Sequence, residues 1–389
     1  MQTPFILTPS ASKSLPFKIV DNIVTDFKIR TMSINFNTAG FVKEAGYGPD
    51  DYERRVNLLA EFMKIMARDY HVKIFNLQEM TSRYMRMEQI RNLLMKQLLT
   101  VSTAWTATNP FGRHADANMS LHLMTFYNAN VFHLNSITNC HFSYGDARTV
   151  GDDLCPEQSS KTTSNAMIMD MSLIVPKEDS EFHSEGVSVD NNAKYLNVNV
   201  HMPLRGCYKV KSMEKILKQI EEYPNIETYF VSVSGDMNLF GDESECNQII
   251  DTMKKIGKTN AIPTENNVYQ YETLFGNRLR TGTFIGMLYD LKNNMKLDIN
   301  HETYKTWING NTDEILKISG RKLQPLDWHL SRDQPWCETI KTQVVDMTDL
   351  RELKFDVPII ADDKEIPDLG NFITDHIPLL STIQFSHQK

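Results

Sequence analysis

The stretch that decides the fold is TYFVSVSGDMN, residues Thr228–Asn238. Its first seven residues are mostly β-branched and aromatic and predict a strand. Gly-Asp-Met-Asn, residues 235–238, follows at once, so that Asp236 and Asn238 stand just past the strand. Strand ends in α/β sheets are where side chains from distant parts of a chain converge on one crevice. The stretch therefore predicts an α/β protein with a polar site at the end of this strand.

Further strands and helices are predicted on both sides of this stretch. Period-two alternation or apolar β-rich runs indicate strands, and apolar stripes at helical spacing indicate helices. Gly, Asp, Ser and Thr between residues 143 and 165 predict a long loop. The predicted strands are 27–36, 72–79, 121–127, 166–175, 195–201 and 228–234, and the predicted helices are 51–70, 85–99, 212–223 and 244–256.

Polar residues stand at or just past the ends of apolar, β-rich runs. Carboxylates, amides and histidines in one crevice are what metal-assisted phosphoryl chemistry requires. Hydrolysis of a phosphate ester needs neutralised phosphoryl charge, an oriented water and a stabilised leaving oxygen. The residues in question are Asn35, Glu79, His201, Asp236, Asn238 and His376.

Hard oxygen ligands among these residues and their neighbours suit a magnesium ion. Asn35, Glu79 and Asp375 are the candidate ligands, because Mg²⁺ takes few protein ligands and prefers oxygen. Mn²⁺ is a possible substitute. We expect Asp236 to align or deprotonate the attacking water and Asn238 to donate to a phosphoryl oxygen.

Two histidines complete the predicted catalytic set. His201 and His376 can donate to the phosphoryl oxygens, and a carboxylate such as Asp327 would fix the tautomer of one of them. Each residue alone also has a plain structural explanation: Gly-Asp-x-Asn can be a turn, Glu79 a solvated surface residue and His201 a core histidine. Independent turns, however, have no reason to appear in one fixed order.

That order resembles the endonuclease/exonuclease/phosphatase superfamily, typified by deoxyribonuclease I, over about residues 27–385. Singly the matching motifs are weak, whereas the ordered set is specific. The motifs are Ser33–Asn37, Leu77–Glu79, Val198–Pro203, Ser234–Phe240, Leu326–Leu330 and Thr374–Leu379.

The resemblance implies an α/β (α+β) fold, a four-layer sandwich of two packed mixed β-sheets flanked by helices. It implies one domain over residues 27–385 after a lead segment, 1–26, with insertions near 140–165, 290–325 and 335–370. It implies metal binding by Asn35 and Glu79 with Asp375 close by. The catalytic residues would be His201, Asp236, Asn238, Asp327 and His376, with Asp327 paired to His376.

Two departures bear on the substrate. Deoxyribonuclease I-like members commonly carry an arginine where this chain has Asn165, which puts a phosphate contact there in doubt. Abasic-site endonucleases carry a tyrosine where this chain has His201, which disfavours that branch. The histidine form is shared by nonspecific nucleases, deadenylases, sphingomyelinases, inositol-polyphosphate 5-phosphatases and tyrosyl-DNA phosphodiesterases.

The favoured substrate is a phosphodiester in nucleic acid, because nucleases are numerous in the superfamily. The alternatives are inositol phosphates, phospholipid head groups or another small phosphoester, and a non-catalytic binding module on the same fold. A net charge of −8 means that a polyanion must be met by metal or by a local basic patch. The best candidate patch is Arg278, Arg280, Lys317, Arg321 and Lys322 near Trp307 and Trp328, although a solvated charged surface is the favoured interpretation of these residues.

Composition sets the remaining expectations. The five cysteines show no C-x-x-C pair, which argues against zinc and against a disulfide framework. No signal peptide and no apolar run of the roughly 20 residues that a membrane span needs is visible. We therefore expect a cytoplasmic protein without a membrane span, although non-classical secretion would escape this test.

Overall fold

A computed structural model describes most of the predicted elements. It describes residues 26–36, 49–82, 84–112, 121–144, 162–176, 187–203, 206–239, 326–345, 347–355, 374 and 376–386, with short pieces at 19–20 and 23–24 and between 248 and 280. The predicted helix 244–256 falls largely outside these residues, as does the range 290–325.

One large sheet, called sheet A, is built around the strand that carries Asp236. Its strand order is β11-β16-β10-β9-β8-β7. Among its described strands only β9 and β10 pair in parallel, and the other pairs are antiparallel, so the sheet is mixed. Its strands are β7 (Phe132–Tyr144), β8 (Thr162–Pro176), β9 (Val187–His201), β10 (Phe230–Asp236), β11 (Thr259–Asn260) and β16 (Asp327–Arg332).

The second large sheet, called sheet B, has the strand order β15-β14-β17-β18-β3-β4-β6-β5. It is mixed as well, because β3 pairs in parallel with β4, and β14 with β17. Its strands are β3 (Asp26–Asn35), β4 (Val72–Thr81), β5 (Trp105–Ala107), β6 (Leu121–Asn128), β14 (Tyr271–Thr273), β15 (Leu279–Arg280), β17 (Cys337–Val344) and β18 (Leu379–Ser386).

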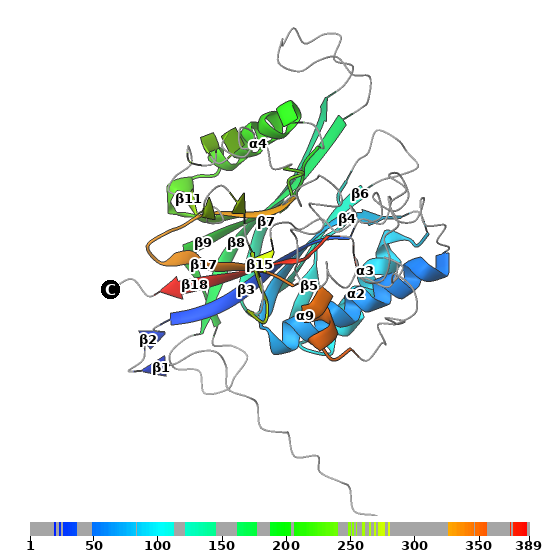
Figure 1. The fold of residues 1–389 in the computed structure, drawn as a ribbon. Coiled ribbons are helices and arrows are strands. Elements are labelled where there is room, and N and C mark those ends of the chain that lie inside the picture. Colours follow the sequence, from blue (N-terminus) through cyan, green and yellow to red (C-terminus); the bar gives the residue numbers. More distant parts are fainter. Residues whose placement is uncertain are drawn as a thin grey trace, which may run out of the picture.

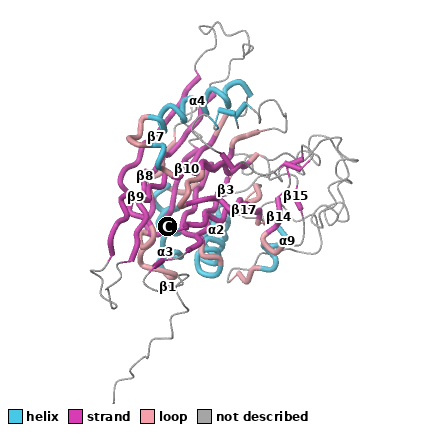
Figure 2. The backbone as a smooth tube through the Cα atoms, turned by 90° about the vertical axis from the view of Figure 1, so that its left-hand side faces the viewer, coloured by secondary structure: helices cyan, strands magenta, loops and turns pink. Residues whose placement is uncertain are grey.

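Helices cover the outer faces of the two sheets, as Figure 1 shows, and Figure 2 gives the same arrangement after a quarter turn. Apolar residues of α4 (Gly206–Glu221) pack on sheet A, and those of α2 (Pro49–Asp69) and α3 (Met87–Leu99) pack on sheet B beside α9 (Met347–Glu352). The order of layers is helix, sheet, sheet, helix. The predicted sandwich of two mixed sheets is confirmed.

The space between the sheets changes from apolar to polar along each central strand. On β9 the inward residues run from Tyr195 through Asn197 and Asn199 to His201, and on β4 Ile74 is followed by Asn76. Apolar side chains from both sheets form a buried cluster at one end of this space. The polar end is where the candidate site lies.

Two smaller findings concern the remaining segments. β7 and β8 extend to Tyr144 and from Thr162, so the ends of the predicted loop at 143–165 are strands. Short β1 (Ile19–Val20) pairs with β2 (Ile23–Val24), β12 (Thr264–Glu265) with β13 (Val268–Tyr269), and η2 (Ile226–Thr228) is one 3₁₀ turn. None of the helices that the structure describes is long and apolar enough to cross a membrane.

Candidate active site

Sheet A brings three candidate residues into one row. Asp236 pairs in register with His201 on one side and with Asp327 on the other. Residues that are directly paired on neighbouring strands point to the same face of a sheet. All three therefore face sheet B, His201 and Asp236 at the ends of β9 and β10 and Asp327 at the start of the antiparallel β16.

Sheet B supplies Asn35 and Glu79 from its central strands β3 and β4. Glu79 has a φ of 54°, and the pairing of β4 with β6 shifts register between Leu77 and Met80. A bulge re-aims side chains, and a non-glycine residue in the left-handed region is a sparsely populated conformation that clusters at functional sites. Because of this irregularity, two successive side chains of β4 point toward sheet A. Gln78 contacts Asn199 in the layer below the site, and Glu79 contacts Asn35 and His201 in the site itself.

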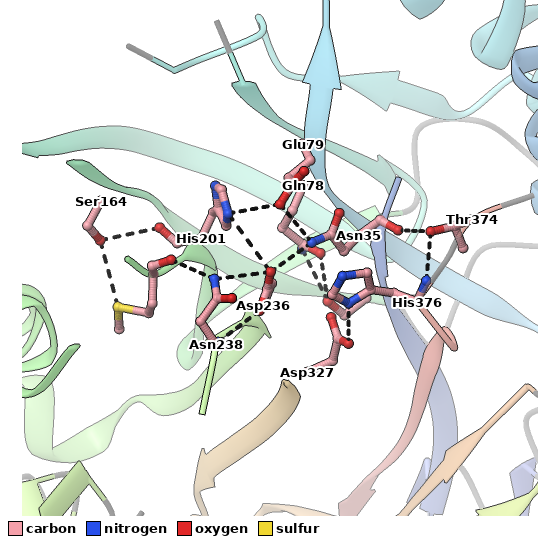
Figure 3. A network of polar contacts seen from close by, with 12 residues as sticks. Asn35, Gln78, Glu79, Ser164, His201, Asp236, Asn238, Asp327, Thr374 and His376 are labelled. Carbon is pink, nitrogen blue, oxygen red and sulfur yellow. Dashed lines mark hydrogen bonds and ion pairs between the residues drawn. The ribbon is translucent and has the colours of Figure 1, made fainter. Parts of the chain in front are cut away.

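The two sheets meet through a small set of polar contacts, shown in Figure 3. Asn35 donates from Nδ2 to Asp236 Oδ2 at 2.8 Å and to Glu79 Oε1 at 3.2 Å. His201 Nε2 lies 3.2 Å from Glu79 Oε1 and 3.9 Å from Asp236 Oδ2. These four residues, predicted from widely separated motifs, form one cluster.

The Gly-Asp-Met-Asn segment makes both a turn and a part of the site. The backbone N–H of Asn238 donates to Asp236 Oδ1 at 2.8 Å, and Asn238 itself has a φ of 50°. Its side-chain Nδ2 donates to the Met202 carbonyl at 2.8 Å, just past His201. The turn explanation and the site prediction therefore describe the same segment.

The predicted pair of Asp327 with His376 is present. Asp327 Oδ2 accepts from His376 Nδ1 at 2.7 Å, and both side chains are buried. The backbone N–H of His376 donates to Thr374 Oγ1 at 3.1 Å, and that hydroxyl donates to the Asn35 carbonyl. Thr374 thereby joins the last segment of the chain to β3. Asp375 lies outside the described residues.

The charges of the cluster are coupled through its contacts. Burial disfavours a charge on Glu79, but the hydrogen bond and positive charge of His201, with His376 and Asn35, lower its pKa below the ordinary value. Burial by itself would lower the pKa of His201, but Glu79 and Asp236 together raise it. An ionised Glu79 and a protonated His201 therefore stabilise each other.

Asp236 has a different environment from Glu79. Burial, partly opposed by His376 and reinforced by Asp327, raises the pKa of Asp236 to about 7. Strongly perturbed titratable groups in a cleft are candidates for functional residues. A carboxylate with such a pKa can take up and release a proton near neutral pH.

The donor set fits a divalent cation. Ligand atoms of Glu79, His201 and Asp236 lie within 4.8 Å of one another, and in the part of the chain that the structure describes they are the group able to hold a metal ion. Two carboxylates supply the hard oxygen that Mg²⁺ or Mn²⁺ prefers. The raised pKa of His201 favours a proton on that imidazole, so Glu79 is the strongest ligand candidate.

A layer of buried amides beneath the cluster escaped sequence analysis. Gln78 donates from Nε2 to Asn199 Oδ1 at 2.7 Å and to Ser33 Oγ at 3.1 Å, which connects the sheets. Asn76 and Asn197 exchange two hydrogen bonds of 3.0 Å. The available signal was the repeated amide at alternate positions of strands expected to be buried.

The candidate basic patch has one residue whose side chain the structure describes, Trp328. Trp328 is fully buried in the apolar cluster on the outer face of sheet A and presents no face for stacking. Side chains of the other patch residues lie outside the described part of the chain.

Comparison with known proteins identifies the fold. No family model matches the sequence, and no curated protein matches it. An endonuclease/exonuclease/phosphatase family protein from Bacteroides thetaiotaomicron has a similar structure, with a TM-score of 0.52 and 13% identity, covering 93% of this chain and 99% of that chain. A mannosyl-6-phosphatase from the same bacterium gives a TM-score of 0.50 at 12% identity, covering 91% and 99%. The chain has the endonuclease/exonuclease/phosphatase fold, as the ordered motifs predicted.

Proposed function

We propose that this chain is a divalent-metal-dependent phosphoesterase that hydrolyses a phosphodiester bond, with Mg²⁺ as the metal and nucleic acid as the favoured substrate. The observation that carries the proposal is the convergence of two separate polar units. The Glu79–His201–Asp236 cluster and the Asp327–His376 pair come from both sheets and meet at one edge of the sandwich. The plain structural explanations, a turn for Asp236 or a core histidine for His201, do not account for either group of contacting residues.

Asn35 and Glu79 are the proposed metal-binding residues, with Asp375 adjacent to His376 in the chain. A bound divalent cation supplies neutralisation of phosphoryl charge and lowers the pKa of a bound water. The protein holds Glu79 ready for this through Asn35 Nδ2, which bridges the carboxylates of Glu79 and Asp236. Glu79 stays ionised because its pKa is lowered by His201.

Asp236 is the proposed general base. Its Oδ1 accepts from the Asn238 backbone and its Oδ2 from Asn35, so the carboxylate is fixed in orientation. A pKa of about 7 is close to the value at which a base is both deprotonated and able to accept a proton. Asn238, whose Nδ2 donates to the Met202 carbonyl and to Asp236 Oδ2 in this structure, is proposed to exchange the longer of these contacts for a phosphoryl oxygen of the substrate.

The two histidines are proposed to act on the phosphoryl group from opposite sides. Asp327 accepts the Nδ1–H of His376, so Nε2 is the atom proposed to act on the phosphoryl group, to which it donates when the ring is protonated. Against the effect of burial, Glu79 and Asp236 raise the pKa of His201, which favours a proton on that imidazole. It can therefore donate to the phosphoryl group or to the leaving oxygen.

The substrate is open between two chemical classes. Nucleic acid is favoured by the number of nucleases with this fold. A small phosphoester is the alternative, and it agrees with an acidic chain of net charge −8 and with a similar solved structure that is a mannosyl-6-phosphatase. A non-catalytic module is disfavoured because each described site position keeps a competent side chain.

The test is a substrate panel with Mg²⁺ or Mn²⁺: single- and double-stranded DNA, RNA, poly(A), inositol phosphates and sphingomyelin. The panel compares the wild type with the double variant Asp236→Asn, His376→Ala. A matched control is His133→Ala, an exposed histidine on β7 that pairs with Ser172 away from the site. We expect metal-dependent cleavage by the wild type and the control only. Equal rates for the wild type and the double variant would refute the enzyme proposal, and cleavage of inositol phosphates alone would refute the nuclease preference.

A further inference from the structure

The row of site residues on sheet A continues past His201 onto two more strands. Asn165 on β8 pairs with His201, and His141 on β7 pairs with Asn165. The same row contains Asp236 and Asp327. Five neighbouring strands thus place five polar side chains at one level.

The two added residues point to the site face of the sheet. Their chain neighbours Cys140 and Ala166 lie in the apolar cluster under α4, together with Val200 next to His201. Successive residues of a strand point to opposite faces, so His141 and Asn165 share the face of His201. With strands about 4.8 Å apart, His141 stands roughly 10 Å along the row from His201.

A hydrogen bond holds the outer histidine in place. His141 Nδ1 and Asn165 Oδ1 are 2.9 Å apart. Asn165 is 3% exposed, whereas His141 is half-buried and reaches solvent. Because Nδ1 is engaged by Asn165, His141 contacts a ligand through Nε2. In the protonated ring Nε2 carries a hydrogen and donates. In the neutral ring it donates only if Asn165 is flipped so that its Nδ2 donates to His141 Nδ1.

We propose that His141, oriented by Asn165, is a subsite for a second phosphate of the substrate, beyond the phosphate that is cleaved. The proposal rests on the proposed function of the Asp236–His376 site. The backbones of His141 and His201 lie about 10 Å apart along the row, and the buried Asn165 stands between them and holds the His141 ring on its far side. His141 therefore selects substrates that continue past the reacting group, whether the second phosphate belongs to a nucleic acid strand or to a small molecule with several phosphates.

The test compares substrates with one and with several phosphates. Bis(p-nitrophenyl) phosphate has only the phosphate that is cleaved, whereas a five-residue oligothymidylate offers neighbouring ones. An inositol bisphosphate and an inositol monophosphate form the second pair, which distinguishes a small substrate from a nucleic acid strand. The proteins are the wild type, His141→Ala, His141→Gln and the His133→Ala control from the same strand.

We expect His141→Ala to lower kcat/KM by about tenfold, through KM, on whichever multi-phosphate substrate the wild type cleaves, because a charge-assisted hydrogen bond is lost. Hydrolysis of bis(p-nitrophenyl) phosphate should be unchanged, and His133→Ala should match the wild type throughout. His141→Gln, which keeps a polar partner for Asn165, guards against a folding effect and should lose the same preference. An equal effect on one-phosphate and multi-phosphate substrates, or no effect on either, would overturn the subsite while leaving the proposed function intact. An inactive wild type would overturn both.

Discussion

Gly235 is the position where a single methyl group should disturb both the fold and the site. It lies directly before Asp236 and pairs with Val200 on the parallel strand β9. Its φ is 148°, and an added Cβ would lie 2.0 Å from the Val200 carbonyl oxygen and 2.9 Å from the Val200 carbonyl carbon. Both are backbone atoms that cannot rotate away, so Gly235→Ala must push β10 and β9 apart.

The magnitude follows from two separate costs. Inserting a group into a closely packed interior costs about 1 to 3 kcal/mol. Holding a residue with a side chain in a sparsely populated backbone region costs about 1 to 3 kcal/mol. We expect Gly235→Ala to lower the free energy of unfolding by about 4 kcal/mol. The folded fraction should also lose activity, because the move separates Asp236 from His201.

The assay is urea unfolding of the wild type and the variant, and Gly276→Ala is the matched control. Gly276 also has a positive φ, 69°, but its added Cβ would meet Glu272 Oε1 at 3.0 Å, a side-chain atom that can move. The control should therefore lose only about 1 kcal/mol, the cost of the backbone conformation alone. A loss of less than about 1 kcal/mol in Gly235→Ala, or equal losses in the two variants, would refute the reasoning.

Three further predictions test the amide layer, the histidine pair and a buried titration. Gln78→Leu leaves Asn199 Oδ1 without its 2.7 Å donor in the interior and should cost about 2 kcal/mol in urea unfolding. Asp327→Asn replaces the acceptor that fixes the His376 tautomer and should lower kcat on bis(p-nitrophenyl) phosphate about a hundredfold or more. His329 is buried, which lowers its pKa to about 4, so the unfolded chain takes up its proton first as pH falls. Folding stability should therefore fall between pH 7 and pH 5, and His329→Gln should lose about 2 kcal/mol less over that interval than the wild type.

Distinct outcomes would contradict these three predictions. An unfolding free energy for Gln78→Leu at or above the wild-type value would mean that the amide layer is not stabilising. An unchanged kcat in Asp327→Asn would remove the pair from the reaction. The same pH dependence in His329→Gln and the wild type would show that another group governs acid stability.

The strand ends could be predicted because their chemistry is local. Asn35, Glu79, His201 and Asp236 each follow an apolar β-rich run, and the order of the motifs was enough to expect one site. The structure brings these four into direct contact. The pairing of Asp327 with His376 was expected from the resemblance and is present.

The buried amides of β9 and the strand β7 could not be predicted, because each depends on contacts with another strand that is distant in the sequence. Asn197 and Asn199 alternate with apolar residues on β9, a pattern that usually marks a solvent-facing side, yet both are fully buried. They face amides of β4, which only the packing of the sheets brings near. The long strand β7 also escaped prediction. Polar residues dominate Phe132–Tyr144, so the sequence lacks a strand pattern there, and the strand is defined by its pairing with β8.

The most direct test of the central claim is the initial rate of bis(p-nitrophenyl) phosphate hydrolysis by metal-stripped protein as Mg²⁺ is added, for the wild type and Glu79→Gln. We expect no rate without metal and a saturable rise in the wild type. The variant should fold normally but need at least about tenfold more Mg²⁺, because it lacks one ligand charge. A wild-type rate that does not depend on Mg²⁺, or identical Mg²⁺ curves for the two proteins, would contradict the account.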